Sequence, residues 1–303
     1  MYKRQVIQSL LLLEQSRKSG REEKGLYLDG KYIALGNSQD VVYDKAQSDQ
    51  IEISYTTSEG KIICNEYAFE QDTDFLPLVR HDGCEANLAV NAFIYMSAYR
   101  IKPQERYSVL NEKELKQREF GNNGEYALQY LSAYGNTDVK NEKVVEDKNE
   151  NKSLLMQVRS WMDPPGVSPQ IRVLMETRSS ELMFDFVEGK ERSNSYKSVN
   201  VGFGITYVLP VVIALLTAEK GDVVIIENPE AHIHPAGQRM LGELIARVGA
   251  GGVQVFVESH SEHIVNGVRI AVKNGQISKD NVQIAFFYKD EENDYKHTFK
   301  SLN

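Results

Sequence analysis

Two short segments in the last third of the chain carry carboxylate, amide and imidazole side chains. Each segment, "DVVIIENPEAHIHP" and "VQVFVESHSEHI", contains a continuous apolar run and ends in polar residues. The polar residues are Glu227, Asn228, Glu230, His232 and His234 in the first segment, and Glu258, Ser259, His260 and His263 in the second. Four of the six histidines of the chain therefore fall in this region. Such groups transfer protons and ligate metal ions.

The elements around these segments are predicted to alternate between strand and helix. The runs "VVIIE" and "VQVFVES" read as strands, whereas "YVLPVVIALLTAEKGD", "PAGQRMLGELIARVGAGG" and "SEHIVNGVRIAVKNG" read as helices with their exits. Fully apolar strands that alternate with helices indicate a parallel sheet covered on both faces. Ligand sites in such sheets lie at the carboxyl ends of the strands, so both polar groups are expected there.

A glycine pair precedes the first of these helices. The stretch "NVGFGITYVLP" places Gly202, Phe203 and Gly204 ahead of it, so that backbone N–H groups at the helix start are expected to face an anion. Close packing or a tight turn is the alternative explanation of these glycines. Pro210 is expected near the first turn, where a missing N–H does least harm.

The preceding two thirds of the chain change character twice. Residues 25–36 and 50–70 show β-rich runs joined by Asp-Gly and Ser-Glu-Gly turns, which predict antiparallel hairpins. Residues 88–134 follow a helical pattern. The charged stretch 135–153 is predicted to be a mobile insert or, alternatively, a solvated charged helix. We expect three parts, at 1–87, 88–195 and 196–303.

The composition is that of an ordinary globular protein, with 41% hydrophobic and 26% charged residues. A formal charge of -8 argues against general affinity for nucleic acid or anionic membranes, although it is compatible with a local basic patch. The longest apolar stretch, "ITYVLPVVIALL", is too short to cross a bilayer. Two cysteines, Cys64 and Cys84, are expected to be free thiols in a cytoplasmic protein.

The ordered set of a Gly-x-Gly helix, then "IIENPEAHIHP", then "VESHS" resembles one family of proteins. It is similar to the P-loop ATPases with ABC-type heads of the RecF, SMC and OLD group, especially the stand-alone bacterial AAA-family ATPases. The resemblance covers nearly the whole chain, including "YRIKPQERY" and "FGNNGEYALQYL". It implies a P-loop NTPase-like α/β fold with a parallel-sheet lobe, an antiparallel β lobe and a helical insert. It also implies ATP and Mg²⁺ as cofactors.

The resemblance implies a role for each polar residue at the first strand end. Glu227 matches the Walker B position, where a carboxylate holds Mg²⁺ directly or through water. Asn228 stands where related heads carry the catalytic glutamate, and an amide orients a water molecule without accepting its proton. Glu230 is the nearest alternative base.

Other positions match motifs that act across a dimer in this family. His232, His234 and Pro235 correspond to the D-loop region, which crosses between subunits, and His260 corresponds to the switch histidine that senses the γ-phosphate. Gly202, Phe203 and Gly204 correspond to the signature motif, which contacts ATP bound to the opposite subunit. The resemblance therefore implies a homodimer with ATP sandwiched at its interface.

The chain begins with an apolar stretch, "VIQSLLLL" at residues 6–13, that matches the helix after the phosphate loop of this family. No glycine loop precedes it, and the match of Lys3 to the phosphate-binding lysine is read as coincidence. The alternatives are a natural relic that lost its loop and a gene cut short upstream. We favour the second, because "MYKRQ" reads as the translated end of a sequencing-library transposon adaptor. This chain alone is then expected to bind ATP weakly and to be inactive.

Three functions are compatible with these residues. The first is a dimeric ATPase switch in DNA repair or anti-phage defence, with DNA or a separate nuclease effector as partner. The second is a non-hydrolysing nucleotide sensor or scaffold, which Asn228 favours. The third is a metal-dependent hydrolase in which His232 and His234 join His260 or His263, since imidazole suits zinc, iron or manganese. The alternative is a purely structural role, in which Glu227 or Glu230 caps the next helix and His260 is a hydrogen-bonded residue at a strand end.

Overall fold

The computed structural model describes most of the chain, and its backbone divides into two compact units, Met1–Ala89 and Val90–Asn303. The described residues are 2–21, 24–42, 48–57, 60–83, 90–146, 151–162, 168–176, 179–188, 191–192, 194–289 and 295–300. None of the helices in these ranges is both long and apolar enough to cross a membrane. Cys64 is a free thiol, as expected, and Cys84 lies outside the described residues.

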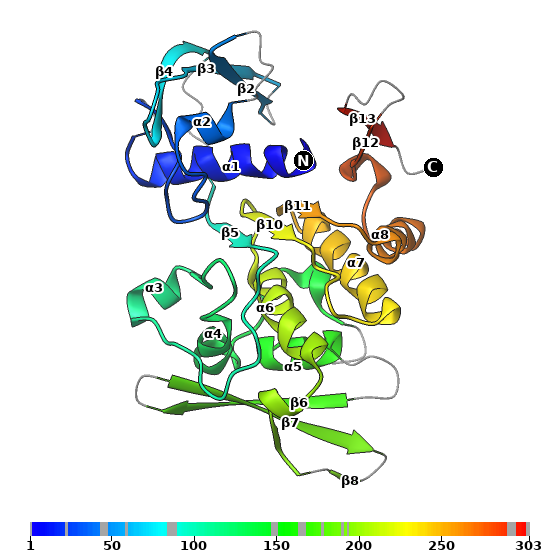
Figure 1. Ribbon diagram of the computed structural model, residues 1–303. Coiled ribbons are helices and arrows are strands. Elements are labelled where there is room, and N and C mark those ends of the chain that lie inside the picture. The colour runs from blue at the N-terminus through cyan, green and yellow to red at the C-terminus, as the bar shows by residue number, and fades with distance from the viewer. Residues whose placement is uncertain are drawn as a thin grey trace. The chain divides into compact units, whose positions relative to one another are not determined.

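The first unit is a helix packed on an antiparallel sheet, shown in blue and cyan in Figure 1. Helix α1 spans Tyr2–Lys18 and includes the apolar residues 6–13. Strands β1 (Gly25–Tyr27), β2 (Gln50–Thr56), β3 (Ile62–Ala68) and β4 (Phe75–Asp82) form a sheet in the order β1-β4-β3-β2, with the short helix α2 at Ser38–Val41. The predicted hairpin of β2 and β3 is confirmed. The hydrophobic core of the first unit is a cluster of Leu12, Leu26, Leu28, Tyr67 and Leu76.

The second unit is built around a three-stranded parallel sheet. Strand β10 (Val223–Glu227) lies between β5 (Phe93–Met96) and β11 (Gln254–Glu258), and both pairings are parallel. Because the strands run in register, Glu227 is level with Glu258 at the carboxyl end. The helical pattern predicted for residues 90–100 is wrong, since this stretch contains β5. A short apolar run such as "FIYM" suits a buried strand as well as a helix, and periodicity alone does not separate the two.

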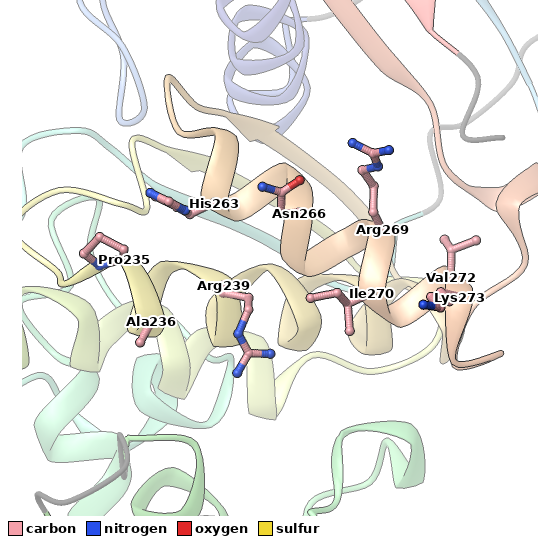
Figure 2. Close-up of a pocket in the computed structure, with 9 residues that line it drawn as sticks. All are labelled: Pro235, Ala236, Arg239, His263, Asn266, Arg269, Ile270, Val272 and Lys273. Carbon is pink, nitrogen blue, oxygen red and sulfur yellow. The ribbon is translucent and has the colours of Figure 1, made fainter.

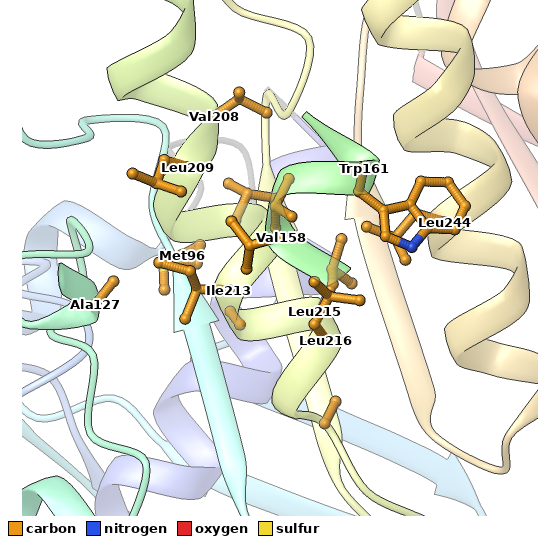
Figure 3. Close-up of a cluster of buried hydrophobic side chains, with 14 of the residues drawn as sticks. Met96, Ala127, Val158, Trp161, Val208, Leu209, Ile213, Leu215, Leu216 and Leu244 are labelled. Atoms are coloured by element: carbon orange, nitrogen blue, oxygen red, sulfur yellow. The ribbon is translucent and has the colours of Figure 1, made fainter. Parts of the chain in front are cut away.

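Helix α6 (Phe203–Thr217) is the centre of the main core. Its residues from 208 to 216 are buried throughout, so the helix is covered on all sides. It packs against α4 (Ala127–Tyr134), α5 (Leu154–Trp161) and α7 (Pro235–Ala250). Figure 3 shows the side chains of this cluster, among them Met96 from β5, Trp161 from α5 and Leu244 from α7.

Pro210 lies inside α6, so the expectation that it stands near the first turn is wrong. A glycine allows this arrangement. Gly124 has a φ of +80°, and a Cβ on it would overlap the ring of Pro210. The loop before α4 therefore packs the backbone of Gly124 directly on the ring of Pro210.

The charged stretch expected to be a mobile insert is packed in its described part. Asn141 caps a short 3-10 helix, Glu142–Val144, in which Val144 is fully buried. Arg247 of α7 donates to the carbonyl oxygens of Lys143 and Val145. The composition missed this because a few long-range contacts, not the average polarity, order the segment. Residues 147–150 lie outside the described part.

The remaining elements of the second unit surround this core. Strands β6 (Ser168–Glu176), β7 (Ser179–Glu188), β8 (Glu191–Arg192) and β9 (Tyr196–Lys197) form an antiparallel sheet, and a 3-10 helix at Ser198–Asn200 leads into α6. Helix α3 spans Glu112–Lys116. Helix α8 (Glu262–Lys273) packs against α7, and a 3-10 helix, Lys279–Asn281, precedes the hairpin of β12 (Ile284–Lys289) and β13 (Tyr295–Lys300).

Candidate functional site

Glu227 is the last residue of the central strand β10, and its side chain is only 5% exposed. The hydroxyl of Tyr95 on the neighbouring strand β5 donates a hydrogen bond to its Oε1 at 2.8 Å. A buried carboxylate needs such a donor, because losing water without a partner is costly. The strand pairing therefore fixes one oxygen of Glu227 at the carboxyl edge of the sheet, where the sequence predicted a site.

Arg100 supports the backbone at the same end of β10. Its two terminal nitrogens donate to the carbonyl oxygens of Glu227 at 2.6 Å and of Asn228 at 3.1 Å. The residue is 5% exposed, and burial lowers the pKa of its guanidinium. Its Nε has no hydrogen-bond partner among the described residues. Sequence reasoning assigned no role to Arg100, because its partners lie more than a hundred residues away in the chain.

The guanidinium of Arg100 also lies 5.2 Å from the ring centroid of Tyr207 on α6. The ring of Tyr207 also makes an edge-to-face contact with the ring of His232, and the two ring centroids are 5.1 Å apart. Cation–π and edge-to-face contacts of this kind stabilise by about 0.5–2 kcal/mol each. Arg100, Tyr207 and His232 therefore connect the end of β10 with α6 and with the region that follows the strand.

The turn after β10 contains two residues in the left-handed backbone region. Asn228 has a φ of +45° and His232 a φ of +63°, and Asn and His tolerate this conformation better than most residues. The N–H of Asn228 donates to the carbonyl oxygen of Glu258 at 2.8 Å, which extends the pairing of β10 with β11 by one bond.

Glu230 joins the two strand ends. Its Oε1 accepts a hydrogen bond from the N–H of His260 at 2.7 Å, and its Oε2 accepts one from the hydroxyl of Ser259 at 2.8 Å. The sequence offered Glu230 as an alternative base, and in this structure both of its oxygens are already engaged. The arrangement holds the loop after β11 in place beside the loop after β10.

His260 is exposed, and its Nε2 lies 3.4 Å from a carboxylate oxygen of Glu258. His263 follows in the first turn of α8, whose N-cap is Ser261. In the described part of the chain, no three His, Cys, Asp or Glu side chains lie close enough to hold a metal ion together. The proposed set of His232 and His234 with His260 or His263 is therefore not assembled in this structure.

The D-loop candidates lead directly into helix α7. His234 is the N-cap, with its Nδ1 accepting from the N–H of Ala236 at 3.3 Å, and Pro235 is the first helical residue. Both His232 and His234 are exposed. A proline at this position removes an N–H that has no partner within the helix. The histidines are thus presented at the surface by a well-defined helix start.

The signature candidates form the start of α6. Gly202 is the N-cap without a side-chain hydrogen bond, and Phe203 is 61% exposed. A Cβ on Gly204 would overlap the carbonyl oxygen of His232, whereas a Cβ on Gly202 would meet nothing within 4 Å. Close packing therefore explains why residue 204 is a glycine, since a side chain there would separate the start of α6 from the D-loop region. Gly202 lies in open space at a helix end suited to an anion.

Comparisons with known proteins find similar solved structures and one matching family. Solved structures that match include one described as "Structural biochemistry of ATP-driven dimerization and DNA stimulated activation of SMC ATPases", at 13% identity and a TM-score of 0.35, covering 49% of this chain and 84% of that one. Another is the SmcHead bound to the C-winged helix domain of ScpA, at 10% identity and a TM-score of 0.47, covering 89% and 81%. A third is the SMC head domain from Thermotoga maritima, at 8% identity and a TM-score of 0.36, covering 95% and 87%.

No curated protein matches the chain significantly. Residues 65–266 match the family described as "AAA domain, putative AbiEii toxin, Type IV TA system". This range includes β5, α6, β10, α7 and β11, together with every residue of the candidate site described above. The chain therefore belongs to this AAA-domain family, as an AAA-type ATPase head with a mixed α/β, P-loop NTPase-like fold.

Proposed function

We propose that this chain provides the Mg²⁺–ATP face of an ABC-type ATPase head that works as a dimeric conformational switch. The observation that carries the proposal is Glu227, a buried carboxylate at the end of the central parallel strand, oriented by Tyr95. Membership of the AAA-domain family supports nucleotide binding. Because Mg²⁺ in nucleotide sites is bound through one or two carboxylates plus phosphate oxygens, a single protein carboxylate fits it.

The bound Mg²⁺ would neutralise phosphate charge, and the residues of this chain would position the other groups. Asn228 would orient a water molecule through its amide, and His260 would contact the terminal phosphate as the switch. Glu230 would hold the His260 loop, given that both of its oxygens accept hydrogen bonds from that loop. In this arrangement Glu230 acts in positioning.

A dimer is part of the proposal. Gly202 and Phe203 at the start of α6 are exposed, and so are His232 and His234 beyond β10. The packing of Gly204 on the carbonyl oxygen of His232 joins these two exposed segments into one surface. A second head placed on that surface would offer its nucleotide to the N–H groups of the α6 start. The surface therefore suits an ATP sandwich between two copies.

The printed sequence contains no G-x-x-x-x-G-K-[ST] motif, so we propose that a segment upstream of residue 1 supplies the phosphate loop. The isolated chain is then expected to bind ATP weakly. We place the intact protein in the cytoplasm, in DNA repair or anti-phage defence, with DNA or a separate nuclease effector as partner. The family description, which names a toxin of a toxin–antitoxin system, supports a defence role.

The test is ATP turnover by the chain extended with the upstream sequence recovered from the source DNA. We expect turnover that requires the extension and falls at least about a hundredfold in Glu227→Gln and in His260→Ala, the scale of a lost electrostatic contact in a transition state. Glu262→Gln, an exposed carboxylate beside the site, is the matched control and should retain full turnover. Equal turnover in Glu227→Gln and the parent would contradict the proposal.

The second candidate is a nucleotide sensor that binds ATP without hydrolysing it, and Asn228 favours it. Replacing Asn228 with Glu in the extended protein separates the two. A large gain in turnover would identify the parent as a sensor, because the new carboxylate supplies the missing base. No gain, or a loss, would point to hydrolysis through another group.

A further inference from the structure

A groove of about 870 Å³ lies between α7 and α8 and adjoins the candidate nucleotide site at Pro235. The two helices approach closely where a Cβ on Gly242 would overlap the carbonyl oxygen of Ile264 and one on Gly267 would overlap that of Arg239. Figure 2 shows the lining residues in two rows, one along the start of α7 and one along the length of α8. The close backbone contact fixes both walls of the groove relative to one another.

The walls of the groove carry positive charge. Arg239, Arg269 and Lys273 line it together with His263, and none of its described lining residues is Asp or Glu. The pairing of Arg239 with Glu243 lies within α7, whereas Arg269 and Lys273 are exposed, with no ion pair among the described residues. In a chain with 43 acidic and 35 basic residues, this local excess of cations stands out against the overall charge.

The groove is also apolar. Ala236 from α7 and Ile270 and Val272 from α8 contribute to its lining. A nucleic acid backbone would be held by the cations but would gain little from these side chains. A helix with one apolar face and acidic residues beside it would satisfy both features, as in recognition of a helix in a groove. Arg269 and Lys273, four residues apart on α8, lie about 6 Å apart along the axis and match carboxylates at the same spacing.

One end of the groove lies next to the candidate site, as Figure 2 shows. Pro235 and His263, in the first turns of α7 and α8, are among its lining residues. They follow the D-loop residue His234 and the loop of His260. The N-cap of α8, Ser261, also donates to the side chain of Gln238 on α7, so the two helix starts are linked. An occupant of the groove would contact both helices that begin at the nucleotide site.

We infer that this groove is the docking site for an acidic amphipathic helix of a partner protein. Apolar side chains of the helix fill the floor beside Ile270, and its carboxylates pair with Arg269 and Lys273. Docking itself depends only on the groove. Its coupling to the nucleotide rests on the proposed function, through the helix starts that the groove shares with the D-loop and the switch.

The experiment measures binding of fluorescent probes to the full chain by anisotropy, without nucleotide. The probes are a peptide of about 18 residues with a leucine face and a glutamate face, its counterpart with lysine in place of glutamate, and a single-stranded oligonucleotide. We expect the acidic peptide to bind and the basic peptide not to bind. Because no step uses ATP, failure of the nucleotide site would leave this result unaffected.

Variants locate the binding. The double variant Arg269→Glu, Lys273→Glu should lower the affinity for the acidic peptide at least about tenfold, equivalent to 1.4 kcal/mol. The matched control Lys113→Glu, Lys279→Glu makes the same change of charge at exposed positions outside the groove and should weaken it less than about twofold. Ile270→Ala, which keeps every charge, should also weaken the binding of the acidic peptide. Thermal unfolding of each variant confirms that it is folded.

Five results would overturn the inference, and the first four concern the probes and the charge variants. They are no binding of the acidic peptide, equal binding of the basic peptide, equal loss in the control and groove variants, and binding of the oligonucleotide in place of the peptide with loss in the Arg269, Lys273 variant. The fourth result would assign the groove to nucleic acid. A peptide that binds the parent and the Ile270→Ala variant equally would likewise remove the helix as occupant, because charge alone would then explain the affinity.

Discussion

The guanidinium of Arg100 donates to the carbonyl oxygens of Glu227 and Asn228, the last residue of the central strand and the first residue after it. These two carbonyls belong to the residues that the family resemblance places at the Mg²⁺ and at the attacking water. Through Tyr207 the same guanidinium contacts α6, whose start carries the signature candidates. A residue to which the sequence assigned no role therefore supports the backbone of the candidate site.

Arg100→Met is expected to destabilise the protein by about 2–4 kcal/mol, because the carbonyl oxygen of Glu227 loses its Arg100 donor and that of Asn228 keeps only the N–H of Ala231. Arg100→Lys should recover only part of the loss, since an ammonium group does not reproduce the fork of two donors. Urea denaturation measures both. Arg106→Met, at a side chain that is 63% exposed, is the control and should change stability by less than about 0.5 kcal/mol. Equal stability of Arg100→Met and the control would contradict the bracing role.

Gly204→Ala is expected to cost about 1–3 kcal/mol, because the added methyl group overlaps the carbonyl oxygen of His232. Gly202→Ala provides a matched control two residues earlier, where the same methyl group meets nothing within 4 Å. It should cost about 0.5 kcal/mol, the scale of an N-cap change. Denaturation of the two variants side by side is the measurement, and an equal cost would show that Gly204 has no special contact.

Glu230→Gln is expected to loosen the loop after β11. The glutamine oxygen accepts from the His260 N–H and its NH₂ group donates to the Ser259 hydroxyl, so both hydrogen bonds to a carboxylate are replaced by weaker neutral ones. Hydrogen exchange at the His260 amide should become faster, with a loss of about 1–2 kcal/mol in global stability. Glu262→Gln, exposed in the first turn of α8, should leave that exchange unchanged. Unaltered protection of His260 in Glu230→Gln would mean that Glu230 does not hold the loop.

The stability of the first unit should depend on alkaline pH through Tyr67. Burial raises the pKa of this phenol to about 12, against the opposing effect of its hydrogen bond with Asn65. A folded-state pKa above the unfolded value of about 10 means that the unfolded chain deprotonates first. The resulting stability is complete below about pH 10 and is lost as the pH rises towards 12, by about 2–3 kcal/mol. Denaturation of Tyr67→Phe across this range should lack the decrease, and a parallel decrease in the variant would assign it elsewhere.

The sequence by itself determined the strands and helices that frame the site. Continuous apolar runs predicted β10 and β11, and glycine and serine boundaries predicted α7 and α8, because burial and capping are recorded locally. The same runs predicted that Glu227 and His260 would stand at one edge of a parallel sheet. The order of these motifs was enough to indicate an ATPase head, and the match to the AAA-domain family confirms it.

Only the tertiary structure decided which residues hold the site together. Tyr95 reaches Glu227 across 132 positions of sequence and Arg100 reaches it across 127, because β5 pairs beside β10. The stretch that contains β5 read as a helix, so this pairing was not predictable from its periodicity. Likewise, the packing of Gly124 on Pro210 and the groove between α7 and α8 arise where distant surfaces meet. Local propensity fixes what an element is, whereas contacts between elements depend on which surfaces bury one another in three dimensions.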